Sequence, residues 1–252
     1  MNNVENLDNN YIYKVSDAPS DEVLIYHHLG LGDVIICNGF INYLSSKKFE
    51  KIYLVIDEKF YKSIDYLYSE NDKINLMPVK LKSVNNADEE VLKISRNTGM
   101  KPLKVGFSYF PGKKFYKAFY KQIKLPYRYS YSYFYQPRDL KREKKLYEHL
   151  LNYYDIKTGK YNIIHSQASN KTYDLNIKNN NDNVLIERES DIFQNMFLYN
   201  YLIENADEIH CVNSSFCHFV DRVKTNGSLY YHDVRGSKLQ LKQNWKNVDY
   251  GN

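Results

Sequence analysis

Residues 23–44, VLIYHHLGLGDVIICNGFINYL, restrict the fold more than any other part of the sequence. The first four are an apolar run typical of a buried strand, and apolar side chains recur with helical spacing after Asp33. Between these two parts, Gly30 and Gly32 allow a turn in which the backbone can approach a ligand closely. The segment therefore predicts a strand, a glycine turn and a helix, which is the beginning of an α/β fold.

The first half of the chain continues this alternation. Apolar runs predict further strands at residues 51–57, 74–79 and 103–107, and helical spacing predicts a helix at residues 60–68. Strands that alternate with helices in this way favour a mostly parallel sheet with helices on both faces.

The pattern restarts after a charged helix predicted at residues 138–154 and a Thr-Gly turn at Thr158. We expect strands at residues 161–165, 184–187, 208–212 and 228–231, with helices at residues 192–204 and 215–223. The 252 residues exceed the usual domain size of about 100–150 residues. The predicted fold class is α/β with two Rossmann-like domains, residues 1–137 and 138–252.

Cysteine content and the apolar runs indicate the compartment. Cys37, Cys211 and Cys217 are an odd number without zinc-ligand spacing, so neither a disulfide framework nor a zinc site is expected. The first ten residues lack the basic and apolar regions of a signal peptide, and no apolar run approaches the roughly 18 residues of a membrane span. We therefore expect a soluble, cytoplasmic protein.

Residues 101–142 are strongly cationic, whereas the whole chain has a formal net charge of only +5. Lysines and arginines alternate there with aromatic residues, a pattern that suits nucleic acid, an anionic glycan or an anionic membrane face. A solvated helix face beside a packed aromatic stripe explains the pattern equally simply. Since no DNA-reading motif is present, we expect no nucleic-acid partner, and an anionic acceptor or peripheral membrane contact instead.

The first candidate site is the turn that contains Asp33. A full dinucleotide-binding fingerprint needs a third glycine where the chain has Ile35, although Asp57 stands where a ribose-binding acid would. A carboxylate just after Gly32 projects into the crevice above the sheet and could take a proton from an acceptor hydroxyl. Alternatively, Asp33 only caps the helix.

The second candidate site is residues 209–218, where a strand runs directly into a helix. The hydroxyls of Ser214 and Ser215, together with the helix amides, suit a diphosphate. The alternatives are that Ser214 is an ordinary helix cap and that His218 is a core histidine.

Charged residues follow the carboxyl ends of other predicted strands, the edge at which open α/β sheets bind ligands. His165 with Lys171, and His232 with Arg235, could neutralise a diphosphate leaving group. Glu187 ends another strand and is a candidate for contact with the base or ribose.

Three short blocks resemble one enzyme family. HLGLGDVI is similar to the N-terminal signature of the ADP-heptose:lipopolysaccharide heptosyltransferases and related GT-B glycosyltransferases, and VNSSFCHF and HSQASNK resemble their donor-binding segments. The resemblance implies a GT-B fold with a nucleotide-sugar cleft between the two domains. It assigns the catalytic base to Asp33, donor binding to Asn213, Ser214, Ser215 and His218, and a phosphate-binding lysine to Lys171. The glycine turn and the strand ends add Gly30, Gly32, His165, Glu187 and Arg235 to the predicted donor-binding residues. Asn213 and Ser215 stand where the family has Asp and Gly, and the chain is shorter than typical members.

The predicted function is transfer of a hexosyl or heptosyl unit, with inversion, from a nucleotide-diphosphate sugar to a glycan or glycolipid acceptor in polysaccharide biosynthesis. No D-x-D triplet occurs, so we expect no metal, and no cofactor besides the donor. The alternatives are a non-catalytic nucleotide-sugar or glycan-binding protein and an NAD-dependent oxidoreductase. Asp33 favours the enzyme over the binding protein, and Ile35 disfavours the oxidoreductase.

Overall fold

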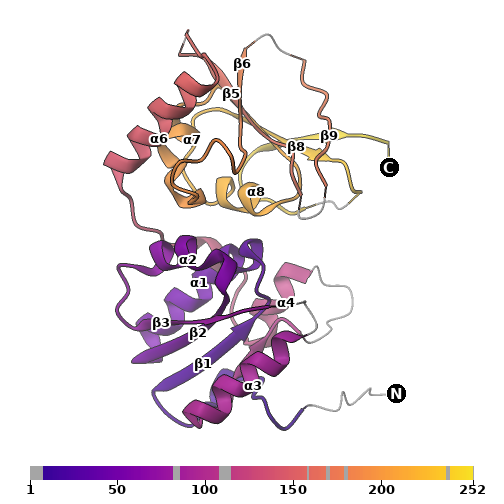
Figure 1. The fold of residues 1–252 in the computed structure, drawn as a ribbon. Coiled ribbons are helices and arrows are strands. Elements are labelled where there is room, and N and C mark those ends of the chain that lie inside the picture. The colour runs from indigo at the N-terminus through magenta and orange to yellow at the C-terminus, as the bar shows by residue number, and fades with distance from the viewer. Residues whose placement is uncertain are drawn as a thin grey trace. The chain divides into compact units, whose positions relative to one another are not determined.

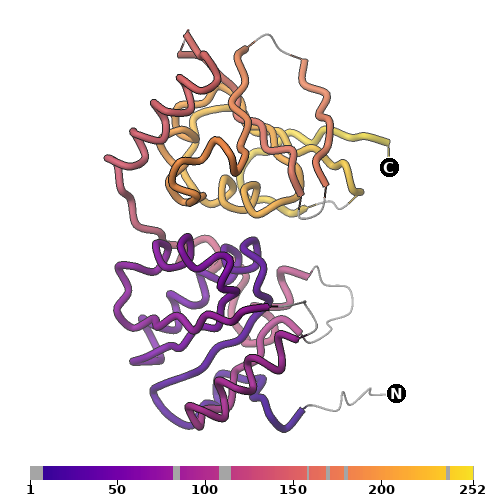
Figure 2. Tube along the Cα trace, in the orientation of Figure 1, coloured from indigo at the N-terminus to yellow at the C-terminus, as the bar shows by residue number. Residues whose placement is uncertain are grey.

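The computed structural model describes residues 8–81, 86–107, 115–157, 159–168, 171–178, 181–236 and 239–251. Lys113, Lys114 and Thr158, which entered the sequence analysis, lie outside these ranges. The contacts within the chain divide it into two units, Met1–Pro137 and Arg138–Asn252. Each unit is built around its own parallel sheet (Figures 1 and 2).

The N-terminal unit has a four-stranded sheet in the order β3-β2-β1-β4. All neighbouring strands are parallel. The strands are β1 Glu22–His27, β2 Lys51–Asp57, β3 Ile74–Val79 and β4 Leu103–Val105. β1 has β2 on one side and β4 on the other. The direction in which the chain adds strands to the sheet therefore reverses between β1 and β4. In doubly wound folds this switch point is where ligands bind.

Helices cover both faces of this sheet, as predicted. The helices are α1 Leu31–Lys47, α2 Tyr61–Tyr68, α3 Ala87–Thr98, α4 Phe115–Gln122 and α5 Tyr129–Ser132. On one face, α3 buries Ala87 and Val91 in a core with Leu24 and Tyr26 of β1. On the other face, the ring of Phe40 in α1 meets His27 of β1 edge-on.

One glycine allows two helices of the N-terminal unit to touch. A Cβ atom on Gly39 of α1 would lie 2.1 Å from the backbone oxygen of Tyr129 in α5. No side chain fits in that space, so glycine at this position permits α5 to close directly on α1.

The C-terminal unit has a five-stranded parallel sheet in the order β6-β5-β7-β8-β9. The strands are β5 Tyr161–His165, β6 Asp182–Leu185, β7 Glu208–Cys211, β8 Ser228–Asp233 and β9 Trp245–Asp249. Its order is that of flavodoxin-like folds, with the switch point between β5 and β7.

The helices of the C-terminal unit contact one face of its sheet. They are α6 Leu140–Tyr153, α7 Asn200–Asn205 and α8 Ser215–Val220. Tyr161 meets Tyr147 of α6 and donates its hydroxyl to the Leu202 carbonyl of α7, while His165 stacks on Phe216 of α8. Tyr161 and His165 are four residues apart on one strand, so they share a face.

The handedness of the connections between strands determines which face of the sheet each connection crosses. Right-handed crossovers place α7 and α8 on the same side, whereas the β5–β6 connection runs in the opposite direction and must cross the opposite side. The described residues of that connection contain no helix. Its segment 171–178 runs on the side of the sheet away from α6 and α7 (Figure 1), and the Asn176 amide donates to the Tyr250 hydroxyl beyond β9.

Candidate functional site

The switch point of the N-terminal sheet carries the predicted base and its neighbours. The turn after β1 contains His28 and Gly30, and Gly106 and Phe107 follow β4. The Nε2 atom of His28 lies 3.1 Å from the Gly106 carbonyl oxygen, and the His28 ring stacks on Phe107. These contacts join the loop that follows β1 to the loop that follows β4.

Asp33 is the third residue of α1 and is therefore not its N-cap residue. The N-cap of α1 is Gly30, whose lack of a side chain leaves the position uncapped. The Asp33 carboxyl instead folds back over Gly30, because a Cβ on Gly30 would lie 2.7 Å from Asp33 Oδ2. Burial raises the pKa of Asp33 to about 7, which is close to the pKa of an efficient general base at neutral pH.

The two neighbouring histidines are poor alternative bases. His27 is fully buried, its Nδ1 atom lies 2.6 Å from the His28 carbonyl oxygen, and burial lowers its pKa to about 4. His28 is held by Gly106, and burial also lowers its pKa. Asp33 is therefore the stronger candidate at neutral pH.

The switch point of the C-terminal sheet brings His165 and Ser214 together. His165 ends β5 and Ser214 follows β7, and the Ser214 Oγ atom lies 3.1 Å from His165 Nδ1. Burial lowers the pKa of His165 to about 4, so its imidazole is neutral at physiological pH. The sequence analysis proposed both residues as donor ligands without predicting this contact.

Ser214 also caps α8, because its Oγ accepts a hydrogen bond from the Cys217 amide at 3.2 Å. Asn213 and Ser215 flank it and are half-buried, and His218 lies one turn into the helix. Burial lowers the pKa of His218 to about 3, which favours the neutral imidazole near neutral pH. Since α8 has only six residues, its dipole contributes little, and the case for an anion here depends on side chains.

The remaining predicted donor residues occupy separate loops on the carboxyl side of the strands. Lys171 lies in a turn closed by the hydrogen bond from the Ala168 amide to its carbonyl, and its amine lies 5.0 Å from the Tyr173 ring centroid. Glu187 is exposed two residues beyond β6, within 3.4 Å of the Tyr154 hydroxyl. Arg235 is exposed two residues beyond β8. The contacts described here do not join these three residues to Ser214.

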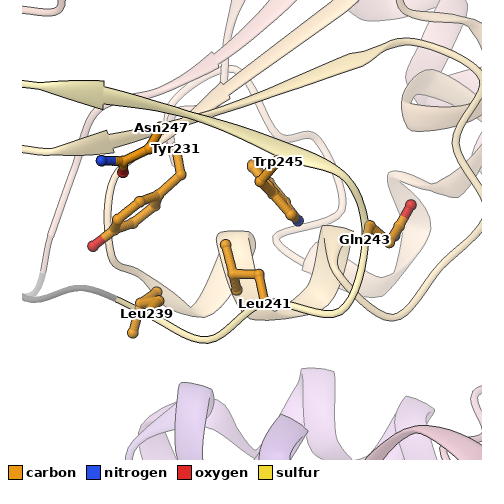
Figure 3. A pocket seen from close by; sticks show the side chains of 6 residues that line it. All are labelled: Tyr231, Leu239, Leu241, Gln243, Trp245 and Asn247. Atoms are coloured by element: carbon orange, nitrogen blue, oxygen red, sulfur yellow. The ribbon is translucent and has the colours of Figure 1, made fainter.

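A separate cavity of about 310 Å³ lies between β8, β9 and the segment that connects them (Figure 3). Trp245 Nε1 donates to the buried Asp221 carboxylate, which also accepts two backbone amides of the connecting segment. None of the predicted donor residues lines the cavity, which is formed by Tyr231, Leu239, Leu241, Gln243, Trp245 and Asn247.

The residue that the oxidoreductase alternative requires is already engaged. Asp57 is almost fully buried, accepts the Lys59 amide at 3.1 Å and forms an ion pair with the Lys59 amine at 2.8 Å. These contacts compete with a ribose for its carboxylate. Among the described residues, no cluster of three or more histidine, cysteine or acidic side chains is arranged to bind a metal ion. The described helices also include none with the length and apolarity needed to cross a membrane.

The sequence analysis missed the aromatic cluster at the N-terminal switch point. The rings of Phe115 and Phe119 approach His28 edge-on, with centroids at 4.8 Å and 5.6 Å. The signals were Phe107 at the end of a predicted strand and the aromatic spacing of α4, but these residues were assigned only to a strand end and a basic segment.

Comparison with known proteins gives a relationship at the level of structure. The sequence matches no protein-family model, and no curated protein matches it either. The fold is similar to the crystal structure of the glycosyl transferase family 9 from Veillonella parvula DSM 2008, with a TM-score of 0.54 and 13% sequence identity. The match covers 83% of this chain and 80% of the other. The chain thus has the fold of a solved family 9 glycosyltransferase.

Proposed function

We propose that this chain is a glycosyltransferase that moves a sugar from a nucleotide-diphosphate donor to an acceptor hydroxyl with inversion. The observation that carries the proposal is the Asp33 carboxyl, which lies at the switch point of the N-terminal sheet with its pKa raised by burial to about 7. The shared fold with a family 9 glycosyltransferase supports it.

In this mechanism, Asp33 accepts the proton of the acceptor hydroxyl as its oxygen attacks the anomeric carbon. The bond from that carbon to the donor phosphate breaks, and its electron pair leaves with the nucleoside diphosphate. Attack from the face opposite the leaving group inverts the configuration. An aspartate whose pKa is near 7 is half deprotonated at neutral pH and is more basic than an ordinary carboxylate.

We assign the leaving diphosphate to the C-terminal switch point. Ser214 and Ser215 offer hydroxyls there, and Lys171 and Arg235, in other loops on the carboxyl side of the strands, are the cationic candidates. The His165 tautomer decides how Ser214 contributes. If Nδ1 carries the proton, His165 donates to Ser214 Oγ and frees the serine hydrogen for a phosphate oxygen. If Nδ1 is bare, Ser214 donates to His165, and Ser215 is the available hydroxyl.

The acceptor side is assigned to the N-terminal unit, where described residues 115–137 include Lys117, Lys121, Lys124 and Arg128 but no acidic residue. This composition supports an anionic acceptor or a peripheral contact with an anionic membrane.

A panel of nucleotide-sugars tests the function directly. Purified protein is incubated with UDP-, GDP-, ADP- and CMP-activated sugars, and release of the free nucleotide is measured with and without glycan acceptors. We expect release from one nucleoside-diphosphate sugar, accelerated by an acceptor. Tight binding of that sugar without release or transfer would favour a non-catalytic binding protein, and selective binding of NAD would contradict both.

A further inference from the structure

Two phenylalanine side chains are exposed at the N-terminal switch point. Phe107 is 38% exposed and Phe115 is 51% exposed, whereas their neighbour Phe119 is fully buried. Single exposed apolar residues are common on protein surfaces. Two that belong to one cluster, in the crevice where such folds bind ligands, are a candidate contact surface.

His28 holds the two rings in fixed positions. Its ring is nearly parallel to Phe107, with centroids 4.3 Å apart and an interplanar angle of 15°. Phe115 meets it edge-on at 4.8 Å and 88°. The hydrogen bond between His28 and the Gly106 carbonyl orients the imidazole. Little rotamer entropy is therefore lost when a ligand covers these rings.

The His28 ring covers one face of Phe107 and the Lys104 amine lies over the other, so Phe107 exposes its edge. The Lys104 amine is 4.6 Å from the Phe107 ring centroid, but its charge is compensated by Asp88 at 2.8 Å. A strongly anionic group gains little at this position. A neutral ligand with an apolar face fits better.

The cluster lies close to Asp33 along the chain. His28 precedes Gly30 by two residues, so their Cα atoms are at most about 7.6 Å apart. Asp33 Oδ2 in turn lies 2.7 Å from the Cβ position of Gly30. His28, which contacts both rings, and the Asp33 carboxyl group are therefore parts of the same turn after β1.

A pyranose ring has both properties that suit this surface, namely an apolar face and reactive hydroxyls. One face carries C–H groups, which aromatic side chains bury well, and its edge carries hydroxyls that remain free to react. We propose that Phe115, with the exposed edge of Phe107 beside the same histidine, forms the acceptor subsite, in which a neutral pyranose ring stacks on Phe115 with a hydroxyl directed at Asp33. This inference rests on the proposed glycosyltransferase function and assigns the acceptor's sugar ring to particular residues.

Kinetics of Phe115→Ala and Phe107→Ala test the subsite. Burial of a phenylalanine ring predicts that either change raises the acceptor KM by roughly 10-fold or more. Phe115→Trp should restore the acceptor KM, because it keeps a flat ring. Tyr61→Ala removes a ring that is 42% exposed elsewhere in the same unit and serves as the control. An acceptor KM within 2-fold of the parent in both alanine variants would overturn the subsite while leaving the function intact.

A binding measurement separates the subsite from catalysis. Saturation-transfer NMR with methyl β-glucopyranoside and methyl β-galactopyranoside should show contact of the ring C–H protons with the parent protein and loss of that contact in Phe115→Ala. This result would support the subsite even if no donor were found. No contact with either pyranoside, combined with binding to phosphatidylglycerol vesicles that Phe115→Ala abolishes, would assign the rings to a membrane and overturn the proposal.

Discussion

The Nδ1 atom of His210 lies 3.0 Å from the Nε2 atom of His232, inside the C-terminal unit. The pair belongs to a chain of hydrogen bonds: Asn176 amide to Tyr250 hydroxyl, Tyr250 hydroxyl with His232 Nδ1, and His210 Nε2 with the Glu208 carboxylate. If Tyr250 donates to His232, each imidazole carries its proton on Nε2, and every donor faces an acceptor. Only one proton fits between the two rings.

This arrangement predicts acid sensitivity of the C-terminal unit. Burial lowers the pKa of His232 to about 4 and also lowers that of His210. The unfolded chain therefore binds protons that the folded unit excludes. The stabilisation is complete above the unfolded pKa of about 6.5 and is lost as the pH falls towards 4. Trp245, the single tryptophan, lies in the adjacent strand β9 and reports unfolding of this unit by fluorescence.

Urea unfolding of His232→Gln between pH 4 and 8 isolates the contribution of the pair. We expect a shallower loss of unfolding free energy below pH 6.5 than in the parent protein. His149→Gln changes a helical histidine outside the chain of hydrogen bonds and should leave the slope unchanged. An identical pH dependence in His232→Gln and the parent would show that the pair does not sense pH.

Replacing Asp33 by Asn distinguishes a base from a structural residue. The change preserves shape and removes basicity, so transfer should slow on the order of 100-fold or more while donor affinity is nearly unchanged. In the parent protein, the rate should rise with pH through about 7, because only the carboxylate accepts a proton. This rise of the transfer rate with pH should be absent in Asp33→Asn.

The contribution of Asp33 to the free energy of unfolding should fall with rising pH, whereas the transfer rate should rise. The pKa of Asp33 is higher in the folded state than in the unfolded chain, so its contribution to stability is present at low pH and is lost between about pH 4 and 7. Thermal unfolding at pH 8 should therefore show Asp33→Asn to be at least as stable as the parent. A variant that binds donor and transfers sugar at the parental rate would remove Asp33 from the mechanism.

Gly30→Ala tests whether the position of the Asp33 carboxyl matters. Gly30 has φ −67° and ψ 144°, which alanine adopts easily, but the added methyl would lie 2.7 Å from Asp33 Oδ2 and displace it. We expect transfer to fall at least roughly 10-fold, with a melting temperature within a few degrees of the parent. Adding Gly30→Ala to Asp33→Asn should cause little further loss, because both act through one group. Additive losses would indicate that Gly30 contributes independently.

Buried strands were the most predictable part of the fold. Residues 51–57, 74–79 and 161–165 form strands with the predicted bounds. Residues 51–57 and 161–165 are mostly buried, as strands of a covered parallel sheet are. Residues 74–79 form an edge strand that buries only Val79, but they still include the apolar run that predicted it. β9 was missed since it is an edge strand with mostly exposed side chains, and α3 was missed since it buries only Ala87 and Val91. The helix predicted at residues 192–204 was wrong. The Asp191 carboxylate accepts the amides of the next turn, and regular helix begins only at Asn200.

The candidate site was predictable as a set of loops but not as a set of contacts. The sequence places Ser214 after one strand and His165 after another, 49 residues earlier. Their hydrogen bond depends on the register of β5 against β7, in which His165 lies opposite Cys211. The same holds for His28 and Phe107, which meet only because β4 pairs with β1. Such side-chain contacts follow from strand order, which no local pattern specifies.

The two functions of Ser214, as helix cap and as phosphate ligand, can be separated by substitution. Ser214→Asp keeps an N-cap of equal quality but directs a negative charge at the proposed diphosphate. We expect parental stability, with nucleoside-diphosphate affinity reduced by at least roughly 1–3 kcal/mol from the lost hydrogen bond and added repulsion. Ser214→Ala is the variant for comparison, because it removes the cap together with the hydroxyl. It should therefore also lower the free energy of unfolding by about 1 kcal/mol.

Ser215→Ala completes the series, because Ser215 is the first residue of α8 and alanine is well accepted there. Titration calorimetry with ADP, GDP and UDP gives the affinities, and thermal unfolding gives the stabilities. If Ser215→Ala weakens nucleotide binding and Ser214→Gly does not, His165 Nδ1 is the bare acceptor that holds the Ser214 hydrogen. If both weaken it, His165 is the donor and both hydroxyls face the phosphate. Parental affinity in Ser214→Asp and Ser215→Ala alike would place the diphosphate elsewhere in the C-terminal unit.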